Sequence, residues 1–94
     1  MKTSQIKMFL SVVRNGSVAA AARELNRSRT TVSTVLASLE DELGVALFER
    51  SGNQLHLTSI GQSILTDCRR FDQVAGQIQA RCQHHLSGVV PSRY

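Results

Sequence analysis

The sequence lacks the features that define disulfide-rich, membrane-spanning or catalytic proteins. It contains only two cysteines, Cys68 and Cys82, with no closely spaced cysteine pair, which argues against a disulfide scaffold and suits a reducing cytosol. No run of apolar residues is long enough to span a membrane. Because the sequence also has no glycine-rich phosphate loop and no nucleophile beside a base, nothing in it indicates an enzyme.

The composition is that of one small globular domain. A chain of 94 residues has room for a single domain with a modest core. Hydrophobic residues make up 41% and charged residues 19%, which favours a folded chain over a disordered one. Eleven Lys and Arg residues against seven Asp and Glu residues give a net charge of +4. This mildly basic balance permits a nucleic-acid partner but does not require one.

Three short helices are predicted in the first half of the chain, because apolar residues recur there at spacings of three and four. The first helix begins near Thr3 and ends at Gly16. Ser17 and Ser28 are suited to cap the second and third helices, and Gly44 closes the third. The predicted apolar faces are Ile6, Phe9, Leu10 and Val13, then Val18, Ala21, Ala22 and Leu25, then Val32, Leu36, Leu39 and Leu43.

After Gly44 the pattern changes from helical to extended. Residues 45–50 (VALFER) and 55–57 (LHL) favour short strands, and Ser51-Gly52-Asn53-Gln54 favours the turn of a hairpin between them. Thr58 is placed to cap a final helix that runs to about Leu86. The apolar residues of this helix form two rows with a seven-residue period. One row is Ile64, Phe71 and Ile78, and the other is Cys68, Ala75 and Cys82, with Val74 nearby.

The second and third helices have the pattern of a helix-turn-helix, since an alanine-rich helix precedes one with a hydroxyl-rich start. The hairpin that follows makes it winged, so the predicted fold is mainly α, a winged helix-turn-helix with a long linker helix. In this geometry the start of the second helix of the motif enters the major groove of DNA. Hydroxyls there can bond to phosphates or base edges, and arginines add positive charge. The predicted DNA-binding residues are Arg27, Ser28, Arg29, Thr30, Thr31, Ser33 and Thr34, with Asn53 and Gln54 at the hairpin tip.

Simpler interpretations of these residues stay open. Arg27 could be a solvated turn arginine, and Asn53 and Gln54 could belong to an ordinary hairpin tip. The acidic residues of the third helix, among them Glu40 and Glu42, lie at its far end, where we do not expect them to meet DNA.

Four sequence motifs follow one another along the chain at defined spacings. They are NGSVAAAARELN, VS, LASLEDELGVALFER and LTSIG. In this arrangement the chain resembles the amino-terminal DNA-binding domain of LysR-type bacterial transcriptional regulators, and its last helix resembles their linker helix. The resemblance implies dimerisation through antiparallel linker helices and binding to two half-sites of an interrupted inverted repeat. Arg50, in FER, matches a family position and is implied to contact backbone phosphate.

The chain departs from the family at the start of its third helix. Where family members commonly have Gln-Pro, it has Arg29-Thr30, and where they commonly have arginine, it has Thr34. The wing, commonly rich in arginine, here has Asn53-Gln54. We therefore expect the sequence preference of this protein to reside mainly in the segment RSRTT, residues 27–31.

The resemblance also implies a division of the chain and a set of partners. We expect a winged helix-turn-helix in residues 1–57, a linker helix in 58–87 and, in 88–94, the start of a connection to a C-terminal effector domain. The expected partners are double-stranded DNA and a second copy, with a small effector bound only by the further domain, no cofactor and no membrane. The expected location is the bacterial cytoplasm, at the nucleoid when bound. The predicted dimerisation residues are Ile64, Cys68, Phe71, Val74, Ala75, Ile78 and Cys82.

The last helix carries two features with rival interpretations. Cys82, His84 and His85 point in different directions on one helix, so we do not expect a metal site. Cys68 lies fourteen residues before Cys82, about 21 Å along the axis, so the two cannot bond within one chain. In an antiparallel pair centred near Ala75 they would face each other. They are therefore either small packing residues or a redox-sensitive contact between chains.

The function that these observations favour is sequence-specific binding of double-stranded DNA by a homodimeric bacterial transcription regulator. The alternative is a protein-interaction module that keeps the winged fold and uses its amphipathic last helix to pair with another protein. The weak positive charge and the wing without arginine at its tip keep this alternative open.

Overall fold

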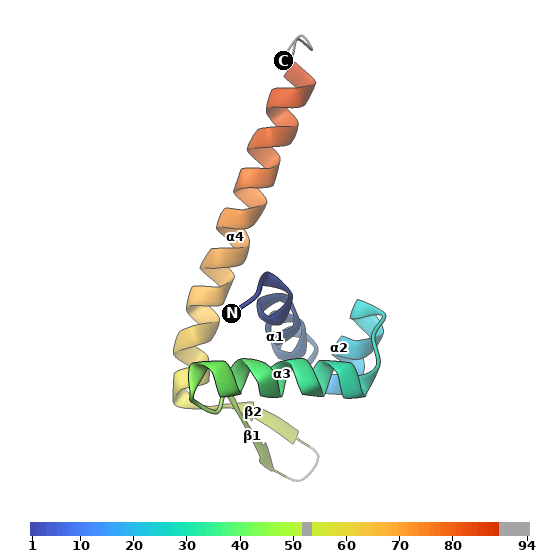
Figure 1. Cartoon of the computed structure of the whole chain (residues 1–94), viewed down its shortest axis with the longest axis vertical. Helices are drawn as coiled ribbons and strands as arrows, with labels where there is room; N and C mark the ends of the chain where they lie inside the picture. Colours follow the sequence, from blue (N-terminus) through green and yellow to red (C-terminus); the bar gives the residue numbers. More distant parts are fainter. Residues whose placement is uncertain (52–53, 89–94) are drawn as a thin grey trace.

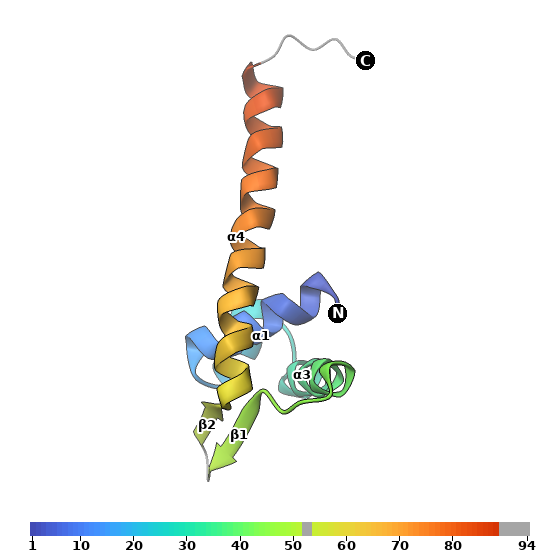
Figure 2. The same cartoon turned by 90° about the vertical axis from the view of Figure 1, so that its left-hand side faces the viewer.

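The computed structural model describes residues 1–51 and 54–88. Three helices lie around the base of a much longer fourth helix, whose C-terminal half projects away from them, and a hairpin lies at the opposite end (Figures 1 and 2). This arrangement confirms the predicted fold class. In chain order the elements are α1 (Thr3–Asn15), α2 (Val18–Leu25), α3 (Arg29–Leu43), β1 (Phe48–Ser51), β2 (Gln54–Leu57) and α4 (Ser59–Gly88).

Local sequence signals set the ends of the first three helices. The hydroxyls of Ser17 and Ser28 each accept a hydrogen bond from the backbone amide three residues on, at 3.1 and 3.0 Å. Gly16 and Gly44 end α1 and α3 in the left-handed region, where a residue without Cβ is favoured. Asn26 takes the same conformation after α2, with a φ of 55°. The predicted caps are therefore confirmed.

The core lies where α1 meets the other three helices. α1 contacts α2, α3 and α4, so it is buried on more than the one face that its apolar spacing indicated. For this reason Met8 and Val12 are core residues, although the predicted stripe omitted them, while Leu10 and Val13 are only half-buried. The largest side chains that are fully buried are Phe9, Val12, Val32, Leu39 and Leu47.

The hairpin strands differ from the prediction at both ends, since β1 begins later and Ser51 and Gln54, predicted in the turn, belong to the strands. β1 begins at Phe48 and not at Val45, because Leu47 is fully buried in the core and the chain becomes a strand only after it. The two strands are antiparallel, with Phe48 opposite Leu57 and Ser51 opposite Gln54. The Phe48 ring packs against Phe9 of α1, with 5.4 Å between ring centroids. The base of the wing is thus part of the core, and its tip extends from it.

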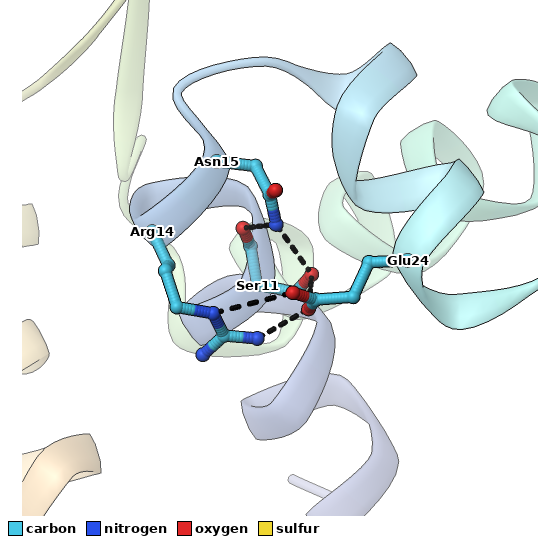
Figure 3. Close-up of polar contacts among 4 residues, drawn as sticks. All are labelled: Ser11, Arg14, Asn15 and Glu24. Carbon is cyan, nitrogen blue, oxygen red and sulfur yellow. Dashed lines mark hydrogen bonds and ion pairs between the residues drawn. The ribbon is translucent and has the colours of Figure 1, made fainter.

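A polar network joins α1 to α2 (Figure 3). The hydroxyl of Ser11, which is fully buried, donates to the Glu24 carboxylate at 2.6 Å. Arg14 forms an ion pair with the same carboxylate, and Asn15 donates to the Ser11 carbonyl at 2.8 Å. The hydrogen bonds from Arg14 and Ser11 lower the pKa of Glu24 from 4.5 to about 2. This network gives the buried Ser11 hydroxyl a hydrogen-bond partner. Burying that hydroxyl without a partner would reduce the stability of the fold.

The lowered pKa of Glu24 predicts a pH-dependent contribution to stability. A carboxyl whose pKa is lower in the folded state stabilises the fold above its unfolded pKa, and that contribution disappears as pH falls. As pH falls from about 4.5 to about 2, we expect the free energy of unfolding of the wild type to decrease more than that of a Glu24→Gln variant. Urea unfolding of both proteins across this range measures the difference. Parallel profiles would show that Glu24 does not contribute in this way.

Candidate nucleic-acid interface

The start of α3 presents the hydroxyl-rich surface that the sequence predicted. Thr30, Thr31 and Thr34 are exposed, and Ser33 is half-buried. On the opposite face, Val32, Leu36 and Leu39 are buried in the core. Arg27 and Arg29 are exposed beside this surface. The division into a solvent face and a core face follows the helical spacing, and Thr34 lies on the solvent face.

Two of the predicted DNA-binding hydroxyls already have partners within the chain. Ser28 accepts from the Thr31 amide and donates to the Thr31 hydroxyl at 2.8 Å. Ser28 therefore has a structural role as the cap of α3. A hydroxyl group has two acceptor lone pairs, so each of these side chains keeps capacity for a further hydrogen bond.

A groove brings together side chains from the start of α3 and from the wing. Arg29 and Ser33 of α3 line it together with Arg50 and Gln54 of the wing. Residues 16–19, which lead into and begin α2, and Leu55 of β2 complete its lining. Two arginines and the amide end of a helix give the groove a positive potential, which suits a phosphate oxygen. The other predicted residues of this region, which are Arg27, Ser28, Thr30, Thr31 and Thr34, do not line this groove.

The wing places Arg50 and Gln54 close to each other in the hairpin. Arg50 pairs with Leu55 and is exposed, and Gln54 is the first residue of β2. Asn53, also predicted to bind DNA, lies outside the described residues.

Thr58 and Glu40 hold the base of the wing from two different helices. Thr58 donates from its hydroxyl to the Ala46 carbonyl at 2.7 Å and from its backbone amide to the Leu47 carbonyl at 3.0 Å. Its hydroxyl also accepts from the Gly61 amide at 3.0 Å, which confirms Thr58 as the cap of α4. Glu40 accepts from the amides of Leu47 and Phe48. The sequence does not indicate this role of Glu40, because nothing about a glutamate in a helix shows which distant amides it will meet.

α4 has two parts with different surroundings. Leu65 is buried and Ile64 half-buried where α4 packs on the domain, although Leu65 was not among the predicted residues. Further along the helix Phe71, Val74 and Ile78 are 46%, 52% and 58% exposed. Three apolar side chains that recur along one helix and remain exposed indicate a face that another surface covers.

The structure corrects the prediction for Cys68. This side chain is only 4% exposed and belongs to the core of its own chain, and burial raises the pKa of its thiol. Cys82 is exposed, and Ala75 is half-buried. Because Cys68 faces its own core, it cannot lie at a seam between chains without a rearrangement, so the packing interpretation is favoured over the redox contact.

Among the described residues, no three His, Cys, Asp or Glu side chains gather in a way that could hold a metal ion. In the same part of the chain, no helix combines the length and apolar character needed to cross a membrane.

Comparison with known proteins identifies the fold as that of a bacterial regulator family. Residues 3–62 match the family described as "Bacterial regulatory helix-turn-helix protein, lysR family". The chain is 39% identical over 90 residues to the HTH-type transcriptional regulators TcbR of Pseudomonas sp. (strain P51) and ClcR of Pseudomonas putida. These matches cover 96% of this chain and 31% of each relative, so the chain spans about a third of their length.

A solved structure supports the same relationship. The structure titled "Crystal structure of CbnR_DBD-DNA complex" superposes with a TM-score of 0.84 at 36% identity, covering 92% of this chain and 99% of that chain. TcbR and ClcR are both named as HTH-type transcriptional regulators. The match over residues 3–62, together with the shared winged helix-turn-helix, shows that this chain belongs to the lysR family of bacterial regulatory helix-turn-helix proteins.

Proposed function

We propose that this chain is the sequence-specific double-stranded DNA-binding part of a bacterial transcription regulator. The observation that carries the proposal is the groove lined both by Arg29 and Ser33 of α3 and by Arg50 and Gln54 of the wing. Helix and wing thereby offer one continuous surface of cations and hydrogen-bonding groups. The similarity to a domain solved in complex with DNA supports this assignment.

In the proposed complex the start of α3 lies in the major groove. Thr30, Ser33 and Thr34 bond to base edges or phosphates, and the threonine methyl groups contact thymine methyls. Arg27, Arg29 and Arg50 neutralise backbone phosphates, with Ser28 and Thr31 at the first turn of the helix. The wing, with Gln54 and Asn53, reaches the neighbouring groove. These assignments combine the exposure of the side chains with the general docking geometry of a helix-turn-helix.

Dimerisation is proposed through α4. The exposed apolar side chains Phe71, Val74 and Ile78 lie beyond the part of α4 that packs on the domain. Covering them with a second α4 in antiparallel orientation removes apolar surface from water. Ile64, Ala75 and Cys82 flank this face. Such a dimer presents two α3 helices to two half-sites of an interrupted inverted repeat.

We further propose that residues 1–57 act as the DNA-binding unit and that 58–87 act as the linker helix. α4 extends to Gly88, and residues 89–94 lie outside the described part of the chain. The relatives are about three times as long as this chain, which leaves room for a further domain, and we propose that a C-terminal domain binds a small effector. The proposed location is the bacterial cytoplasm, at the nucleoid when bound.

Selection of genomic fragments by the 94-residue chain at low salt tests the proposed function. A regulator of this kind should enrich a sequence with inverted half-sites, and its affinity should fall steeply as salt rises, because phosphate contacts release counterions. Enrichment of no sequence would refute specific DNA reading. Weak dependence of binding on salt would instead favour the alternative, a protein-interaction module.

Arg29→Ala should weaken specific DNA binding without unfolding the domain. Loss of one arginine contact is expected to cost about 1–3 kcal/mol, or roughly five- to 150-fold in affinity, and to reduce the salt slope by about one. The matched control is Lys7→Ala, which removes the same charge from an exposed position on α1. Equal losses in both variants would mean that only net charge matters.

Thr34→Ala tests the hydroxyl surface separately. We expect a loss of about 0.5–1.5 kcal/mol in specific binding, because one net hydrogen bond and a methyl contact disappear. Thr66→Ala is its control, since it removes an exposed threonine from α4. Fluorescence anisotropy with the selected sequence and with a scrambled one measures both effects. An unchanged preference in Thr34→Ala would remove Thr34 from the reading surface.

A further inference from the structure

Glu40 lies near the end of α3, far from the start of the helix that is proposed to read DNA. Eleven residues separate it from Arg29, which corresponds to about 16 Å along the helix axis. This separation is too great for Glu40 to share a base or phosphate with Arg29. Any effect of Glu40 on DNA binding must therefore act through another part of the molecule.

The partners of Glu40 identify that part as the wing. One carboxylate oxygen, Oε2, accepts from the Leu47 amide at 2.6 Å and from the Phe48 amide at 3.3 Å. Phe48 is the first residue of β1. Within residues 1–51 and 54–88, these are the side-chain hydrogen bonds that join α3 to the wing. The half-buried position of Glu40 strengthens both bonds, because fewer water molecules compete for its side-chain oxygen.

The second attachment of the wing is to a different helix. Thr58, which caps α4, holds Ala46 and Leu47 through two hydrogen bonds. A two-stranded hairpin of four-residue strands has little stability of its own, so its direction depends on how its base is held. Without Glu40 the wing stays attached to α4 but loses its hydrogen-bonded connection to α3.

We infer that Glu40 is a positioning residue for DNA binding, because its carboxylate orients the wing so that Arg50 and Gln54 face the groove shared with Arg29 and Ser33. Arg50 is only two residues beyond Phe48, so a change of direction at Phe48 moves it directly. The inference rests on the proposed function. It assigns the acidic end of α3 a role in aligning two DNA-contacting elements, not a role in contact itself.

A double-mutant cycle on DNA affinity tests this role. Glu40→Ala should weaken binding of the selected sequence about tenfold, which is the loss expected when one cationic contact is misplaced. Combining Glu40→Ala with Arg50→Ala should add no more than about twofold, because the misplaced wing has already lost the Arg50 contact. Combining it with Thr34→Ala should give additive losses, since Thr34 lies on α3 and does not depend on the wing. All affinities are corrected for the folded fraction, measured by urea unfolding.

Glu40→Gln supplies the matched control. Its side-chain carbonyl oxygen can accept from the same two amides, so we expect affinity within about twofold of wild type. If Glu40→Ala does not fold, Glu40→Asp replaces it in the cycle, because it keeps the charge but is one methylene too short to reach both amides.

The outcomes separate this inference from the proposed function. If the wild-type chain binds no specific DNA, the proposed function fails, and the inference fails with it. If the wild type binds but Glu40→Ala binds equally well, only the inference is overturned. Additive losses with Arg50→Ala, an Arg50→Ala variant that binds like wild type, or a Glu40→Gln variant as weak as Glu40→Ala would also overturn it.

Discussion

Leu39→Ala should lower the free energy of unfolding of this domain by about 2–5 kcal/mol. Leu39 lies on the inner face of α3 and is fully buried. Its truncation removes apolar contacts and leaves a cavity that the helices around it can fill only in part. Small domains have only about 5–15 kcal/mol of stability in total, so this loss is a large fraction of it. Urea unfolding followed by circular dichroism measures the change.

The control for Leu39→Ala lies on the same helix. Thr34→Ala removes an exposed side chain and should change stability by no more than about 0.5 kcal/mol. The two variants should therefore show opposite defects, with Leu39→Ala unstable but normal in DNA affinity per folded molecule, and Thr34→Ala stable but weaker in binding. A Leu39→Ala variant with the wild-type urea midpoint would contradict the assignment of this face to the core.

Gly61→Ala should also destabilise the domain, because α4 passes very close to the segment before the wing. A Cβ atom at Gly61 would lie 2.3 Å from the Leu47 carbonyl oxygen, a backbone atom. That oxygen accepts a hydrogen bond from the Thr58 amide, so it cannot move away without disturbing the joint between α4 and the wing. Overpacking of this kind costs about 1–3 kcal/mol and is expected at the upper end here, since the obstacle is backbone.

Gly76→Ala, in the same helix, is the matched control. A Cβ atom at Gly76 would meet nothing within 4 Å, and alanine is favoured over glycine in a helix by about 1 kcal/mol. We therefore expect Gly76→Ala to raise the thermal midpoint and Gly61→Ala to lower it at the same protein concentration. Equal midpoints for Gly61→Ala and wild type would show that α4 and the wing can separate freely.

Much of this fold could be predicted from sequence because its signals are local. Ser17, Ser28 and Thr58 cap helices, and Gly16 and Gly44 end them, through hydrogen bonds and backbone conformations that involve residues three or four apart. The solvent face of α3, which is the candidate reading surface, follows in the same way from the spacing of its apolar residues. These features depend on a residue and its near neighbours, which the sequence displays directly.

The tertiary structure decided which faces meet. Periodicity showed that Cys68 and Phe71 lie on apolar rows of α4, but only the packing of α4 on the domain buries one and leaves the other exposed. Met8 and Val12 became core residues because α1 is covered from more than one side.

The candidate site shows the same division. The sequence by itself determined the helix-turn-helix, its hydroxyl-rich start and its arginines, because each arises from local patterns. Only the tertiary structure brought Arg50 and Arg29 to one groove and placed Glu40 against the amides that begin the wing. The physical reason is that a contact between residues distant in the chain depends on the angles at which whole elements pack. Those angles come from the combined fit of all the buried side chains, which no single motif encodes.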